Sequence, residues 1–210
     1  MGPPLGVRGY MAMLIHREGG TRLGSGCAWK VALALVLSWC GTPKFARAQT
    51  QILEFRVEAA FVYNFAKFVE WPQEAAGAAP IIFCVLGNES LYGALAESLA
   101  GKTINGRTLV ARQIGRPQEG LRCQIAFIGS AEKKQLGGVL EVLAGSPVLT
   151  VADFESFARR GGMIELIKEG NKIRFAINVD AAKRHGFRIS SKLLQLAEVI
   201  RDPDTPGGKP

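Results

Sequence analysis

Residue types that serve in catalysis are scarce in this sequence. Beyond position 48 the one histidine is His185, which lies in a polar Lys-Arg-His-Gly turn. A nucleophilic triad requires a base next to its nucleophile. The cysteines of this region, Cys84 and Cys123, fall in or beside apolar segments with no neighbouring histidine. The acidic pair Glu165 and Glu169 is typical of a charged hairpin edge. We therefore predict that the protein is not an enzyme.

Two glycine-containing segments match phosphate-binding loops in part. The triplet Gly101-Lys102-Thr103 ends like a P-loop, but the glycine required five residues earlier is Ala96, and a helix is predicted to precede it. Residues 87–90, Gly-Asn-Glu-Ser, occupy a strand-to-helix turn where amides can meet an anion. They lack the Gly-x-Gly-x-x-Gly spacing, which favours a plain turn capped by Asn88. No group of ligating side chains has metal-site spacing, so we predict neither a cofactor nor a metal.

The first 48 residues are typical of a secretory signal peptide. An apolar run at 31–40 follows several basic residues, and Ala46-Arg47-Ala48 provides the small-x-small exit. The run is too short to remain as a membrane span, which needs roughly 20 apolar residues. We predict cleavage after Ala48 and a periplasmic product that does not span the membrane. Translation can start at Met1, Met11 or Met13.

Cys40 raises the alternative of a lipoprotein. Lipidation requires a small residue before the cysteine, and this position holds Trp39. Simple cleavage is therefore favoured over a lipid anchor. In an exported product, the remaining pair Cys84 and Cys123 is more typical of a disulfide than of a metal site.

The charge balance changes once the leader is set apart. Six of the 26 basic residues and one of the 18 acidic residues precede position 49, which leaves a formal charge of +3 rather than +8. Nucleic-acid binders carry a basic stripe with stacking aromatic residues. The basic residues beyond position 48 are instead scattered among acids, so we predict no nucleic-acid partner.

The hydrophobic pattern of residues 49–201 predicts one α/β domain. Apolar residues at three- and four-residue steps predict helices at 51–70, 89–99, 131–143, 154–160 and 191–200. Continuous or alternating apolar runs predict strands at 81–86, 108–114, 123–128, 147–151, 163–168 and 172–178. The order predicts a Rossmann-like sandwich, with a mostly parallel sheet flanked by helices and an antiparallel hairpin at its edge. Residues 202–210, rich in proline and glycine, are predicted to be disordered.

Five blocks of this sequence resemble the YfiR-like family. They keep order and spacing over nearly the whole region beyond the leader, and they lie at 57–72, 83–87, 123–129, 173–182 and 187–197. The resemblance implies a periplasmic α/β domain without known catalysis, able to dimerise. It also implies a disulfide between Cys84 and Cys123. A second cysteine pair of some members falls at 161–165, where this sequence has none.

The resemblance further implies a regulatory function. The best-understood member represses a membrane-bound diguanylate cyclase by binding its periplasmic part, and an outer-membrane lipoprotein relieves that repression. We expect the periplasmic domain of an inner-membrane signalling protein as partner. The alternative hypothesis is a periplasmic small-ligand binder that uses the crevice at the carboxyl ends of the strands.

A basic turn is the expected docking position. Asn178 ends a predicted strand, and Arg184, His185 and Arg188 surround the turn at Gly186. Arginine forks held by a strand and a helix can receive a carboxylate or an acidic partner surface. The next candidate is the aromatic helix that ends at Trp71.

Overall fold

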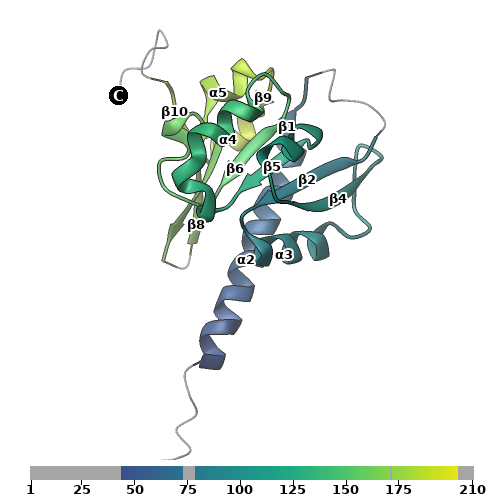
Figure 1. Ribbon diagram of the computed structural model, residues 1–210, viewed down its shortest axis with the longest axis vertical. Helices are drawn as coiled ribbons and strands as arrows, with labels where there is room; N and C mark the ends of the chain where they lie inside the picture. The colour runs from purple at the N-terminus through teal and green to yellow at the C-terminus, as the bar shows by residue number, and fades with distance from the viewer. Residues whose placement is uncertain (1–43, 73–78, 171, 203–210) are drawn as a thin grey trace, which may run out of the picture. The chain divides into compact units, whose positions relative to one another are not determined.

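The computed structural model describes residues 44–72, 79–170 and 172–202 (Figure 1). Most of the predicted signal peptide and nearly all of the predicted tail lie outside these ranges. The α-helices are α2 (Lys44–Phe68), α3 (Glu89–Leu99), α4 (Leu136–Leu143), α5 (Val179–Arg184) and α6 (Ser191–Leu194). Short 3₁₀-helices are η2 (Pro117–Arg122), η3 (Ser130–Gln135) and η4 (Ala158–Arg160).

Among the described residues, eight strands form one sheet and two short strands form another. The short pair is β1 (Val69–Glu70) and β9 (Arg188–Ile189). The large sheet has the order β10-β8-β7-β6-β5-β2-β4-β3. Its strands are β2 (Ile81–Leu86), β3 (Thr103–Ile104), β4 (Arg107–Ile114), β5 (Ile125–Ile128), β6 (Leu149–Ala152), β7 (Ile164–Glu169), β8 (Lys172–Asn178) and β10 (Glu198–Ile200).

The pairing of these strands confirms the predicted fold class. In the large sheet, strands β4, β2, β5, β6 and β7 run parallel to one another, and β10 runs parallel to β8. The hairpin β7–β8, the short pair β3–β4 and the separate pair β1–β9 are antiparallel. Residues of β2 alternate between two cores: Phe83 and Val85 face α2 and α3, whereas Cys84 and Leu86 face α4. This burial on both faces explains the continuous apolar runs of the sequence.

Local sequence signals account for the best-predicted helix. Helix α3 has its predicted bounds because Asn88 caps it, with the side-chain oxygen accepting a hydrogen bond from the Leu91 amide at 3.0 Å. Leu91, Leu95 and Leu99 then form its buried stripe. The predicted hairpin has Gly170 in its turn, with a positive φ of 58°, and residue 171 lies outside the described ranges.

Four predicted helices differ from the structure. The predicted helix at 154–160 is reduced to the 3₁₀-helix η4 at its end, because residues 154–157 form a bend and a turn. Helix α2 begins at Lys44 and ends at Phe68, because the following residues pair with β9. The predicted helix at 131–143 is divided into the 3₁₀-helix η3 and the α-helix α4, which meet at Gln135 and Leu136. The predicted helix at 191–200 is wrong beyond Leu194, since residues 198–200 form β10 parallel to β8. The hairpin is therefore next to the edge, and β10 is the edge strand.

Candidate partner-binding site

A two-stranded ladder brings the end of α2 next to the turn that follows α5. Val69 pairs with Ile189 and Glu70 pairs with Arg188. The amide of Ser190 donates a hydrogen bond to the Phe68 carbonyl at 3.0 Å, which extends the ladder by one step. Two candidates that are far apart in the sequence, the aromatic helix end and the basic turn, are therefore neighbours in the fold.

Trp71 supports this ladder from the core side. Its ring packs edge-on against Phe187 at a centroid distance of 6.2 Å, and its indole nitrogen donates to the Gln124 carbonyl at 3.4 Å. Pro72 packs against Gly186, and a Cβ added to Gly186 would lie 3.1 Å from the proline ring. Gly186 also has a positive φ of 78°, which favours glycine. The half-buried tryptophan thus fixes the ladder on the domain.

The outer side of the ladder is open to solvent. Phe68 is 38 % exposed, and Glu70 and Arg188 are exposed partners across the two strands. Within the described part of the chain, Arg188 forms no side-chain ion pair. We call Phe68, Glu70 and Arg188 the β1–β9 patch, which Trp71 supports from the core side. It combines an apolar ring with a free guanidinium, two groups that are common at protein interfaces.

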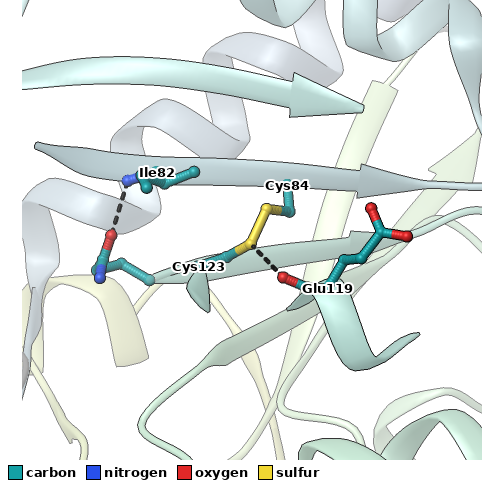
Figure 2. The surroundings of a disulfide bond; sticks show 5 residues. Ile82, Cys84, Glu119 and Cys123 are labelled. Carbon is teal, nitrogen blue, oxygen red and sulfur yellow. Dashed lines mark hydrogen bonds between the residues drawn. A yellow bond between two sulfur atoms is a disulfide. The ribbon is translucent and has the colours of Figure 1, made fainter. Parts of the chain in front are cut away.

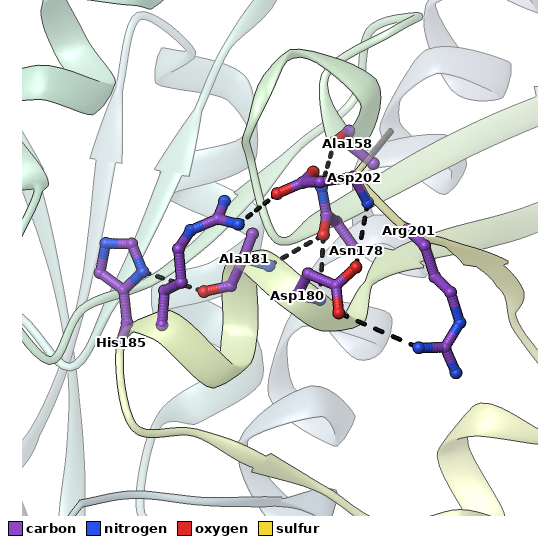
Figure 3. A network of polar contacts seen from close by, with 8 residues as sticks. Ala158, Asn178, Asp180, Ala181, His185, Arg201 and Asp202 are labelled. Carbon is purple, nitrogen blue, oxygen red and sulfur yellow. Dashed lines mark hydrogen bonds and ion pairs between the residues drawn. The ribbon is translucent and has the colours of Figure 1, made fainter. Parts of the chain in front are cut away.

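Asn178 instead has a structural role. It is 0 % exposed and caps α5, its side-chain oxygen accepting from the amides of Asp180 and Ala181 at 3.1 and 2.8 Å. Its side-chain nitrogen donates to the Ala158 carbonyl and to Asp202, each at 2.8 Å (Figure 3). These four bonds use the hydrogen-bonding capacity of the amide, so Asn178 organises the turn from inside.

Arg184 at the end of α5 and His185, which follows it, also have internal partners. Arg184 forms an ion pair with Asp202, and His185 Nδ1 donates to the Ala181 carbonyl at 2.9 Å (Figure 3). Desolvation acts to raise the pKa of Asp202, but the hydrogen bonds from Asn178 and Arg184 together outweigh it and lower that pKa. Arg184 therefore holds the C-terminal segment onto α5, whereas Arg188 lies on β9.

The crevice of the ligand-binding alternative lies at the opposite end of the sheet. The strand order reverses between β2 and β5, where ligands of open α/β sheets bind beyond the carboxyl ends. Here the Gly129 amide donates to the Leu86 carbonyl at 2.8 Å, and an added Cβ on Gly129 would lie 2.5 Å from the Gly87 oxygen. The Glu132 side chain also approaches Gly87. Protein atoms thus fill the space between these two loops.

The disulfide between Cys84 and Cys123 is confirmed. Parallel pairing of β2 with β5 places Cys84 opposite Ala126, and Cys123 lies between the end of η2 and the start of β5. The Cα atoms of Cys84 and Cys123 are 6.0 Å apart, and their sulfur atoms are bonded (Figure 2). Both cysteines are buried. The bond fastens η2 to the centre of the sheet.

A buried charge cluster was missed by the sequence analysis. Lys168 Nζ lies 2.8 Å from Glu54, 2.7 Å from Glu58 and 3.9 Å from Asp153. Glu58 is 0 % exposed, and its Oε2 accepts no hydrogen bond among the described residues. Burial raises the pKa of Glu58 and that of Asp153, against the opposing charge of Lys168. Desolvation acts to lower the pKa of Lys168, but Glu54 and Glu58 outweigh it and raise that pKa.

The acidic pair on the hairpin is split by the structure. Glu165 is buried and accepts hydrogen bonds from the amides of Ser156 and Ala158 at 3.1 and 3.0 Å. It was expected at a charged edge, and it instead anchors the loop before η4. Glu169 is exposed and pairs with Arg174.

The described residues include no cluster of ligating side chains arranged for a metal ion, and none of their helices is long and apolar enough to span a bilayer.

Parts of this chain are similar to solved structures and to a protein family. A conserved domain protein from Vibrio cholerae O1 biovar El Tor is 16 % identical with a TM-score of 0.44, over 56 % of this chain and 54 % of that one. An ABC domain in complex with L-Trp from Streptococcus pneumoniae is 10 % identical with a TM-score of 0.42, over 57 % and 54 %. The chain thus spans about half the length of these structures. Residues 55–198 match the YfiR/HmsC-like family, to which this chain belongs.

Proposed function

We propose that this protein is a periplasmic, non-catalytic regulator that binds and represses a membrane signalling protein, namely a diguanylate cyclase. The observation that carries the proposal is the family match, which extends from the middle of α2 to the first residue of β10. This family is one of periplasmic regulators rather than catalysts. A homodimer and a controlling outer-membrane lipoprotein are further parts of the same proposal.

The partner contact is proposed to lie on the β1–β9 patch. Arg188 has no internal ion pair in the described ranges, and Phe68 presents apolar surface beside the same ladder. Buried arginine and aromatic side chains dominate the energetics of many interfaces. The partner's matching surface would combine an acidic group with an apolar pocket.

Replacing Arg188 by Glu should weaken binding of the cyclase's periplasmic domain by at least about tenfold, as expected for a charge reversal at an interface arginine. The thermal melt should stay nearly unchanged, because exposed substitutions cost little. Binding is measured by titration with the purified periplasmic domain, and repression by the cyclic-di-GMP content of cells.

The matched control is Arg174→Glu, a charge reversal at an exposed arginine on β8. It should bind like the unaltered protein. Full binding by a folded Arg188→Glu variant would move the contact away from the β1–β9 patch. Absence of binding by the unaltered protein would overturn the proposed function itself.

Export is proposed to remove residues 1–48. The mature product would begin at Gln49, five residues into α2 as the structure has it. Intact mass and N-terminal sequencing of periplasmic material measure this directly. A retained leader, or a diacylglycerol mass on Cys40, would contradict it.

A further inference from the structure

A second surface, at the other edge of the sheet, gathers three arginines. In β4 the residue paired with Cys84 of β2 is Arg112. Partners in register on neighbouring strands direct their side chains to the same face of the sheet. Arg112 therefore emerges on the face that also holds the disulfide. There α4 and η2 cover the centre of the sheet, and Arg112 stays exposed at its margin.

The 3₁₀-helix η2 brings two more arginines to this point. Arg116 precedes the helix and Arg122 ends it. Together with Arg112, Gln118 and Glu119 they line an open hollow of about 460 Å³. We name this surface the arginine hollow.

The charges of the arginine hollow are not balanced internally. Arg116 lies 3.4 Å from Glu119, and the two side chains are 80 % and 43 % exposed, so this pair contributes little. Arg112 and Arg122 form no ion pair with any other described residue. Three arginines against one glutamate leave a surplus of two positive charges. Like charges gathered in one concavity attract counter-ions.

We propose that the arginine hollow binds the phosphate group of a ligand. A carboxylate offers two oxygens and one negative charge, whereas a terminal phosphate offers three oxygens and up to two negative charges, which match several guanidinium forks at once. The phosphodiester of a lipid headgroup offers two free oxygens and one negative charge, within reach of fewer forks. Gln118 adds a neutral side-chain donor. The source is either a free phosphate compound or a phospholipid headgroup. Leu121, 43 % exposed next to Arg122, fits the second source as an apolar contact.

The disulfide holds the arginines in place for this role. Arg112 is the register neighbour of Cys84, and Arg122 directly precedes Cys123. The covalent bond between the two cysteines fastens the end of η2, next to Arg122, to β2, and β2 pairs along its length with β4, the strand that carries Arg112. Such preorganisation reduces the ordering cost of binding.

The test uses the double variant Arg112→Glu, Arg122→Glu. Its matched control, Arg159→Glu with Arg174→Glu, reverses two exposed arginines elsewhere on the surface. Inorganic phosphate and pyrophosphate are titrated into each purified protein by calorimetry at low salt. In parallel, each protein is sedimented with vesicles of phosphatidylcholine alone and with vesicles that contain phosphatidylglycerol. Circular dichroism verifies folding.

Affinity for the phosphate probe should fall about tenfold for each arginine removed, the weight of a charged hydrogen bond, and the control should bind normally. Binding of pyrophosphate identifies a free phosphate compound as the ligand. Binding to vesicles that contain phosphatidylglycerol, without binding of phosphate or pyrophosphate, identifies a lipid headgroup. The proposal is overturned if the unaltered protein binds no probe, or if the control loses as much affinity as the double variant. It is equally overturned if the double variant loses only the cyclase's periplasmic domain, which would assign the arginines to an acidic protein partner.

Discussion

Replacing Cys84 and Cys123 together by alanine is expected to lower the free energy of unfolding by about 4 kcal/mol. The cysteines are 39 residues apart. A cross-link removes chain entropy from the unfolded state, by an amount that grows with the logarithm of the number of residues in the closed loop. With a typical dependence on urea for a domain of this size, the unfolding midpoint should fall by about 2 M. Urea titration followed by circular dichroism measures both quantities.

The unaltered protein treated with a reductant is the matched control, because it lacks the bond but keeps both sulfur atoms in the core. Its midpoint should fall nearly as far as that of the alanine variant, and any remaining difference measures packing at Cys84 and Cys123, which are buried. Equal midpoints for oxidised and reduced protein would contradict an entropic contribution of the bond.

The sequence predicted best those elements whose signals are local. Strand β2 and helix α3 have their predicted bounds, because a run of apolar residues buried on both faces can hardly be confused with a surface element. Asn88 and the leucines at four-residue steps determine the helix in the same way. The order of such elements was enough to predict the sheet class.

Contacts between distant segments were beyond sequence reasoning. Residues 198–200 continue the apolar spacing of α6, yet backbone pairing with β8 makes them a strand. Intrinsic propensity is a weak signal where an open sheet edge offers hydrogen bonds. Glu58 likewise fits the polar side of a helix, and only the packing of α2 against β7 shows that this side is covered.

For the candidate site too, the sequence indicated which residues lie in the basic turn but not which of them have partners within the fold. The basic turn is evident in the sequence, but Asp202 pairs with Arg184 and with Asn178, so those two residues serve the fold. Arg188 differs from them only because it lies on β9, opposite Glu70. The arginine hollow had no sequence signal, since strand register and η2 bring together arginines that have no regular spacing.

Replacing Lys168 by Met is expected to destabilise the domain by about 2 kcal/mol. Breaking a fully buried ion pair costs about 3–5 kcal/mol, and the smaller figure allows for a lysine side chain that is 37 % exposed. The loss arises because Glu58 stays buried without its cation. Adding Glu58→Gln to Lys168→Met should therefore restore much of the stability. Lys172→Met, the same change at an exposed lysine on β8, should alter it by less than about 0.5 kcal/mol.

The pH dependence provides an independent test of this cluster. Burial raises the pKa of Glu58 above its ordinary value of 4.5, so the folded state binds more protons than the unfolded state between these two values. By linkage, Glu58 then contributes stability that increases as the pH falls from neutral through its folded pKa. Removal of Lys168 takes away a charge that lowers this pKa, which widens the window. The deficit of Lys168→Met should thus be largest near neutral pH and should shrink on acidification, measured as the free energy of unfolding in urea at several pH values. A deficit that stays constant with pH, or that persists in full when Glu58 is also Gln, would show that Lys168 stabilises the domain through packing of its stem and not through the buried carboxylate.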